Sequence, residues 1–141
     1  MIKNRFIFAG TLCAAFLFSA TSVSAQADFN AFWTKFKTAV VNNDKTTVAN
    51  MTKFPLVMPY GVKDIRTKAS FMKNYANNMN AGGANAGRCF QVAKPERDGK
   101  TYSVFCANES EPESSDNRPN QYYFVKTKTG WKFAGIDNIN E

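Results

Sequence analysis

Five large apolar residues recur at three- and four-residue spacing between residues 27 and 43. They are Phe29, Phe32, Trp33, Phe36 and Val40. This spacing places all five on one face of an α-helix, and Asp28 stands where an N-cap would begin it. An aromatic stripe of this kind belongs more often to a core than to a cofactor site. The stripe therefore predicts a long helix that packs on the rest of the fold.

Two shorter helices are predicted after it. Residues 44–52 read as a helix capped by Asp44, and residues 67–79 as a helix capped by Thr67. Between them, residues 53–66 mix β-branched and aromatic residues with two prolines and a glycine, which predicts two short strands around a Pro-Tyr-Gly turn. The glycine- and asparagine-rich residues 80–87 read as a flexible connection.

The last third of the chain is typical of strands. Residues 88–107 predict a hairpin around the turn Glu-Arg-Asp-Gly, and residues 121–137 predict another that turns at residues 128–130. A long polar segment joins the two hairpins. Three helices followed by a meander indicate an α+β fold, with the helices on one face of an antiparallel sheet.

The first 25 residues have the pattern of a cleaved signal peptide. Lys3 and Arg5 precede an apolar run over residues 6–18, and small residues follow it. Cleavage would fall after Ala25, or alternatively after Ala27. The apolar run is shorter than a membrane span needs. We therefore expect a periplasmic or secreted single domain over residues 26–141, which does not span a membrane.

The number and distribution of charged residues indicate an ordinary solvated surface. The chain carries a formal charge of +7, and loss of Lys3 and Arg5 with the signal leaves 7 − 2 = +5. The lysines are spread along the whole chain and not gathered into one basic patch, so we expect no nucleic-acid partner. Anionic envelope components remain an alternative partner.

Cys89 and Cys106 are the only cysteines of the predicted mature chain. An even pair in an oxidising compartment predicts one disulfide. If Pro95 and Lys100 flank the turn, facing residues sum to 195, and 89 + 106 gives the same sum, so the two would face each other across a hairpin. Two thiolates without any histidine do not make a metal site, and no redox Cys-x-x-Cys motif is present.

Taken together, these segments resemble the nuclear-transport-factor-2-like superfamily. The resemblance rests on the helix with Phe32-Trp33, on the strand-to-helix passage over residues 61–75, and on a final strand that reads Gly130-x-x-x-x-Gly135-Ile. It implies a cone: helices packed on a curved sheet, with a pocket between them. Such folds serve catalysis in ketosteroid-isomerase and polyketide-cyclase relatives and protein binding in others, so the fold does not decide the function.

The acidic residues offer little for catalysis. Most of them occupy predicted caps, turns or the polar segment, where Glu109, Glu111, Glu113 and Asp116 form an acidic loop. Asp64 is the candidate acid or base, although pairing with Arg66 is the plainer interpretation. The chain has no histidine, which excludes an Asp-His couple, and it has no phosphate-binding or dinucleotide motif. We expect no cofactor and no metal, and we interpret the acidic loop as a disordered, solubilising segment.

We therefore predict a non-catalytic binder of a small ligand. Tyr60, Tyr75, Tyr122 and Trp131 are the candidate pocket lining, because aromatic residues with a polar tip suit pockets. Two alternatives stay open: an isomerase- or cyclase-like enzyme that uses Asp64, and a module that binds a protein or an envelope component. The resemblance also allows a homodimer through the open sheet face.

Overall fold

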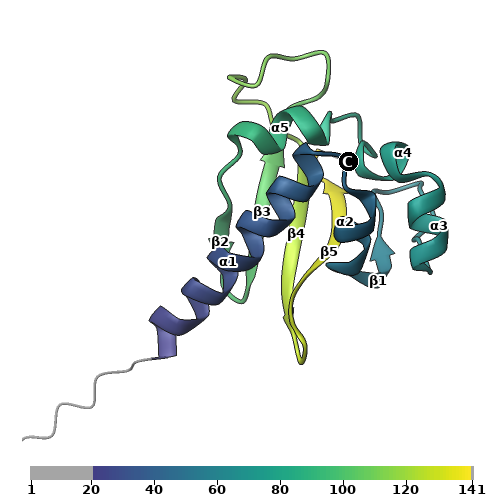
Figure 1. The fold of residues 1–141 in the computed structure, drawn as a ribbon. Helices are drawn as coiled ribbons and strands as arrows, with labels where there is room; N and C mark the ends of the chain where they lie inside the picture. The colour runs from purple at the N-terminus through teal and green to yellow at the C-terminus, as the bar shows by residue number, and fades with distance from the viewer. Residues whose placement is uncertain (1–20, 141) are drawn as a thin grey trace, which may run out of the picture.

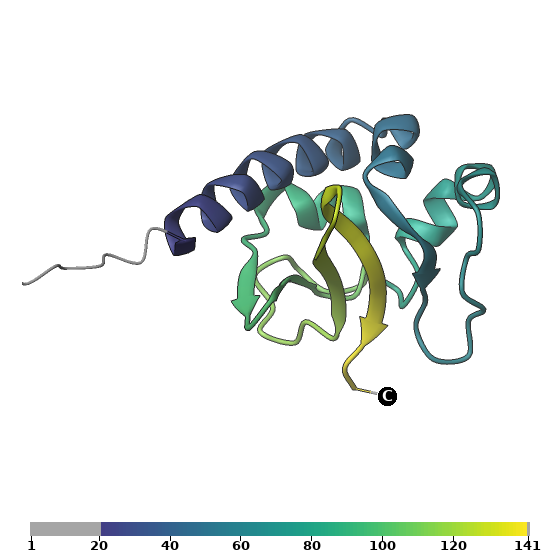
Figure 2. The ribbon, with the colours of Figure 1, turned by 90° about the horizontal axis from the view of Figure 1, so that it is seen from below.

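The computed structural model describes residues 21–140, with side chains described from Gln26 onward. A long helix crosses one face of a five-stranded sheet, and four short helices lie near one end of the sheet and beside it (Figure 1). In the view from below, residues 21–140 place no helix on the opposite face of the sheet (Figure 2). The helices are α1 (Thr21–Val41), α2 (Lys45–Asn50), α3 (Lys68–Lys73), α4 (Tyr75–Met79) and α5 (Ala86–Val92). The strands are β1 (Thr52–Val57), β2 (Glu96–Asp98), β3 (Thr101–Cys106), β4 (Asn120–Thr127) and β5 (Gly130–Asn138).

The sheet is mixed, and this corrects the prediction that it is antiparallel. Its strand order is β1-β5-β4-β3-β2. Strands β2 to β5 form the predicted antiparallel meander, but β1 pairs in parallel with β5, with Thr52 opposite Phe133. The chain leaves β1 through α3–α5 and enters the sheet again at the far edge, so β1 becomes the neighbour of the last strand. The second predicted strand in residues 53–66 is reduced to one bridge between Leu56 and Ile65.

The helices confirm two predicted caps and correct a third. The Asp44 and Thr67 side chains accept hydrogen bonds from the backbone of Thr47 and Ser70, as N-caps do. Helix α1 begins at Thr21, so Asp28 lies inside the helix. The third predicted helix is divided at Asn74 into α3 and α4.

The core between α1 and the sheet is filled by aromatic rings. Phe29 and Phe36 of the predicted stripe are fully buried, and both rings contact Phe124 of β4 edge-on, with centroids 6.0 and 5.3 Å apart. Phe90 and Phe133 continue the cluster from α5 and β5. Each buried ring stabilises the fold by about 2–3 kcal/mol through apolar burial. The stripe on α1 is therefore core, as predicted.

The predicted signal peptide lies outside the described residues, except for residues 21–25, which form the start of α1. Cleavage and export therefore stay predictions. Within residues 21–140, no helix is long and apolar enough to cross a membrane.

Candidate functional site

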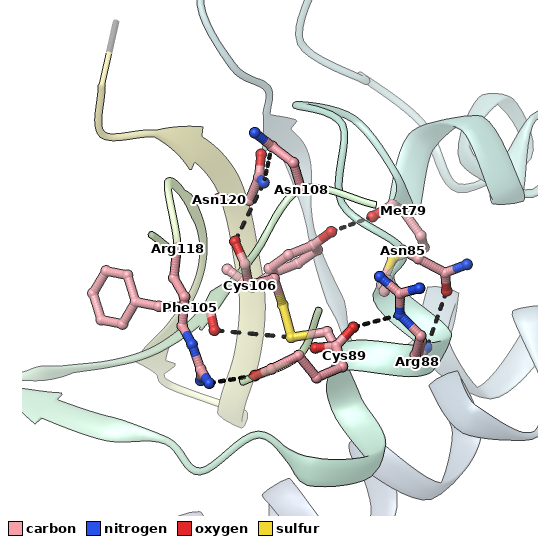
Figure 3. Close-up of a disulfide and its surroundings, with 12 residues drawn as sticks. Met79, Asn85, Arg88, Cys89, Phe105, Cys106, Asn108, Arg118 and Asn120 are labelled. Carbon is pink, nitrogen blue, oxygen red and sulfur yellow. Dashed lines mark hydrogen bonds and ion pairs between the residues drawn. A yellow bond between two sulfur atoms is a disulfide. The ribbon is translucent and has the colours of Figure 1, made fainter. Parts of the chain in front are cut away.

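The predicted disulfide is present. Cys89 and Cys106 are joined, with Cα atoms 5.8 Å apart. The hairpin register that led to this pairing is wrong, however, because Cys89 lies on helix α5 and not on a strand. The hairpin pairs Glu96 with Ser103, so its facing residues sum to 199. The bond therefore fastens a helix to the sheet, where Figure 3 shows it beneath Asn120 and beside Arg88.

The acidic loop is organised by two arginines, which corrects its interpretation as a disordered segment. Arg88 forms a 2.6 Å ion pair with Glu113 and donates to the backbone carbonyls of Glu109 and Glu111. Arg118 donates to the carbonyls of Ser115 and Glu113. The acidic loop is thus fastened to helix α5, which carries Cys89, and it lies next to α5 in Figure 1.

A fully buried asparagine fixes the start of β4 at the same end. Asn120 donates to the Cys106 carbonyl at 3.3 Å and to the Asn108 side chain at 3.0 Å (Figure 3). The side-chain amide oxygen of Asn120 lies against Gly82, and a Cβ added to this glycine would lie 2.4 Å from that oxygen. Gly82 also has a φ of +83°. Its backbone conformation and the lack of room for a side chain therefore both favour glycine at this position. No local pattern in the sequence predicted a role for Asn120 or Gly82.

Trp131 lies at a pocket of about 210 Å³ at the other end of the sheet. The pocket lies between the turn that joins β2 to β3 and the hairpin of β4 and β5. Two of its lining residues are aromatic and buried, Tyr102 at 4% and Trp131 at 9% exposure. Their rings meet edge-on with centroids 5.3 Å apart. The full lining is Arg97, Gly99, Lys100, Tyr102, Lys126 and Trp131.

Helix α1 packs against the aromatic residues of this Trp131 pocket but does not line it. The Phe29 ring stacks on Tyr102 and meets Trp131 edge-on at 5.0 Å. The Tyr102 hydroxyl donates to the Gln26 side chain. Lys126 Nζ lies 5.7 Å from the Trp131 ring and 2.7 Å from a carboxylate oxygen of Asp28. Basic groups therefore surround an aromatic floor, and one carboxylate is already bound at the rim.

Tyr75 and Tyr122 lie elsewhere. Tyr122 is fully buried in the core, and its hydroxyl donates to the Met79 carbonyl. Tyr75 lines a different cavity, of about 190 Å³, between α1 and the segment from α4 to α5. Burial, and then the charge of Asp44, raise the pKa of Tyr75 to about 12. The four predicted aromatic residues therefore do not form one pocket.

Tyr60, Asp64 and Arg66 belong to neither pocket. Tyr60 is 88% exposed in the loop after β1. Asp64 accepts a 3.1 Å hydrogen bond from the Met58 backbone and lines an open depression with Pro55 and Arg66. Its charge also contributes, after burial and Asp137, to a raised pKa of Tyr123. Asp64 thus lies in an open depression, where solvent reaches it, and not in the closed cavity that a catalytic base would favour.

Metal ligation finds no support in the described residues. Between Thr21 and Asn140, no three Cys, Asp or Glu side chains gather closely enough to hold an ion.

Comparison with known proteins gives a likeness of fold alone. No protein-family model and no curated protein matches the chain. Among solved structures, it is similar to a nuclear-transport-factor-2-like protein with a cystatin-like fold from Novosphingobium aromaticivorans, at 11% identity, 82% coverage of this chain and 81% of that chain, and a TM-score of 0.41. It is also similar to a cystatin-like domain of unknown function from Nostoc punctiforme, at 11% identity, 85% and 79% coverage and a TM-score of 0.45.

A third similar structure is a nuclear-transport-factor-2-like protein of unknown function from Pseudomonas putida. It shares 8% identity over 82% of this chain and 86% of that chain, with a TM-score of 0.42. At such identities and TM-scores the likeness says nothing about ligands or activity.

Proposed function

We propose that this protein is an exported binder of small anionic ligands with an aromatic or similarly flat apolar body, and that the Trp131 pocket holds them. One observation carries the proposal: two buried aromatic rings share this pocket with three basic side chains, and no acidic residue lines it. Apolar walls with a few placed charges are the usual composition of a ligand site.

The dimensions of the pocket suggest a ligand of one ring. A cavity of about 150 Å³ is known to accommodate benzene. The 210 Å³ here therefore suit a ring with a carboxylate attached. The ring would contact Tyr102 and Trp131, and the carboxylate would reach Lys100 or Arg97 at the rim. Asp28 pairs with Lys126 at 2.7 Å and offsets that charge, so Lys100 and Arg97 are the cations left for the ligand.

Binding without turnover is the simplest chemistry for this lining. It holds no carboxylate, histidine or thiol that could transfer a proton or attack a substrate. The Tyr102 hydroxyl is engaged by Gln26. The disulfide and the absence of a spanning helix in residues 21–140 are consistent with the export that the proposal includes.

Tryptophan fluorescence tests the proposal with two probes of the same shape. Benzoate carries the charge and benzamide does not. We expect saturable quenching by benzoate, with affinity about two- to fivefold above benzamide, and an advantage that falls as salt rises. Lys100→Gln should remove most of that advantage, whereas Lys128→Gln, on the neighbouring turn outside the pocket, should keep it. Equal affinity for both probes, or no saturable quenching, contradicts the proposal.

A further inference from the structure

The turn between β2 and β3 brings two cations to the rim of the Trp131 pocket. The two strands are joined by a loop of only two residues, and Lys100 is one of them. Arg97 lies just before this loop and pairs with Tyr102, which contributes to the aromatic lining. Paired residues on neighbouring strands point to the same face of a sheet, so the Arg97 side chain lies on the pocket side of β2. Arg97 and Lys100 therefore reach the pocket from one tight turn.

A hydrogen bond holds the Arg97 side chain against this turn. Its Nε donates to the Gly99 carbonyl at 3.1 Å. The two terminal nitrogens of the guanidinium take no part in that bond, and such a pair can donate to two oxygens of one anion. Thr101 braces the same turn, because its hydroxyl donates to the Asp98 carbonyl at 2.9 Å. The position from which Arg97 would bind an anion is thus fixed before a ligand arrives.

The charges around this pocket do not cancel. Lys126 is offset by Asp28, which lies 2.7 Å away. Within residues 26–140, no carboxylate lies close enough to Arg97 or Lys100 to form an ion pair. The acidic residues of β2 alternate with Arg97 and so point to the other face of the sheet, where one of them, Glu96, lines a different depression. Three positive charges and one negative charge leave a net charge of +2 at the pocket.

We infer that the ligand of the Trp131 pocket is an aromatic ring with one doubly charged headgroup, of the phosphate monoester class; this rests on the proposed function. A phosphate monoester carries a charge of about −1.5 to −2 at pH 7, which matches the charge of the pocket. Because Arg97 and Lys100 come from one turn, their charges act at one place. A single dianionic headgroup therefore suits them better than two separate carboxylates. Asp28 determines the specificity, since it occupies the third cation.

Phenyl phosphate and phenyl sulfate test the inference, because both carry a tetrahedral headgroup on the same ring but differ in charge. Chemical-shift titration of the ¹⁵N-labelled protein at pH 8 should locate both probes at residues 97–102 and 126–131. We expect phenyl phosphate to bind about two- to fivefold more tightly than phenyl sulfate, and this ratio should fall as salt rises. Equal affinity for the two probes, or shifts that map to another region, overturns the inference.

Substitutions at the rim test which charges set this ratio. Arg97→Gln should bring the ratio close to one, whereas Arg66→Gln, the same change on an exposed side chain outside the pocket, should keep the wild-type ratio. Asp28→Asn releases Lys126 and should strengthen phenyl phosphate binding about two- to fivefold. A wild-type ratio in Arg97→Gln overturns the inference.

The benzoate and benzamide probes separate this inference from the proposed function. If benzoate binds more tightly than benzamide but phenyl phosphate binds no more tightly than phenyl sulfate, the inference fails and the proposed function stands. If benzoate has no advantage over benzamide, the proposed function fails and the inference fails with it.

Discussion

The hydroxyl of Tyr122 donates a 2.6 Å hydrogen bond to the backbone carbonyl of Met79 and so links the first half of β4 to the end of α4. Tyr122 is fully buried. The neighbouring Tyr75 is nearly as buried, yet its hydroxyl has no partner among the described residues. The two phenols therefore have similar surroundings and opposite hydrogen-bonding states.

This contrast predicts opposite effects of one substitution. Tyr122→Phe leaves the Met79 carbonyl unpaired in the core and should lower the free energy of unfolding by about 1–2 kcal/mol. Tyr75→Phe removes an unpaired oxygen and should leave that free energy unchanged or raise it slightly. Urea unfolding of both variants with the disulfide intact measures the difference. Similar losses in both variants would show that Tyr75 has a partner after all.

Alkaline pH should destabilise the protein through the same residues. Burial and then Asp44 raise the pKa of Tyr75 from 10.0 to about 12, and burial likewise raises the pKa of Tyr122. Above pH 10 the unfolded chain loses these protons while the folded chain keeps them, so stability falls as pH rises. Each such tyrosine contributes a slope of about 1.4 kcal/mol per pH unit in this window.

Urea unfolding at pH 9, 10 and 11 checks this slope. Tyr75→Phe should flatten it between pH 10 and 11, whereas Tyr60→Phe, on an exposed ring, should not. A slope that is the same in all three proteins would be inconsistent with the buried state of Tyr75.

The disulfide should contribute to stability mainly by restricting the unfolded chain. Cys89 and Cys106 are 17 residues apart, and closing a loop of that length contributes about 3 kcal/mol. The double variant Cys89→Ala/Cys106→Ala should lose about that much free energy of unfolding. A reducing agent should lower the stability of the wild type and leave the double variant unchanged. An intact wild type whose mass is not two hydrogens below the reduced chain would contradict the bond.

Arg88 should hold the acidic loop closed without adding much to global stability. Its ion pair with Glu113 is partly exposed, with side-chain exposures of 43% and 23%, and solvent-accessible pairs contribute about 0–1 kcal/mol. Arg88→Gln should nevertheless open the loop locally and speed cleavage after its glutamates by glutamyl endopeptidase. Lys94→Gln, an exposed cation just beyond α5, is the control and should be cleaved at the wild-type rate. Equal rates for both variants would mean that Arg88 does not order the loop.

The sequence predicted the elements whose signals are local. The aromatic stripe of α1, the caps at Asp44 and Thr67, and the final hairpin each depend on neighbours a few residues away. Helix α5 was missed, because glycines and asparagines before it read as a flexible connection. Its signals were nevertheless present: Asn85 caps it, and buried Ala86, Cys89 and Phe90 have helical spacing.

Long-range arrangement could not be read in the same way. The parallel pairing of β1 with β5 depends on the path of the chain across the sheet, which no local pattern encodes. The cysteine pairing was correct only because composition and compartment decided it, since its assumed register was wrong. The predicted pocket residues are all aromatic with a polar tip, but they lie on different strands, helices and loops. Trp131 and Tyr75 therefore line separate pockets near different ends of α1.

Tyr123 lies across Gly135 on the sheet face opposite α1, and this contact predicts a steric coupling. A Cβ at Gly135 would lie 2.4 Å from the Tyr123 hydroxyl and 2.5 Å from Cζ, too close for both to stay in place. Gly135→Ala should therefore cost about 1–3 kcal/mol of unfolding free energy. In a Tyr123→Leu background the same change should cost far less, because the ring is gone. A double-mutant cycle by urea unfolding measures this coupling, and additive losses would show that the ring moves away from Gly135 without cost.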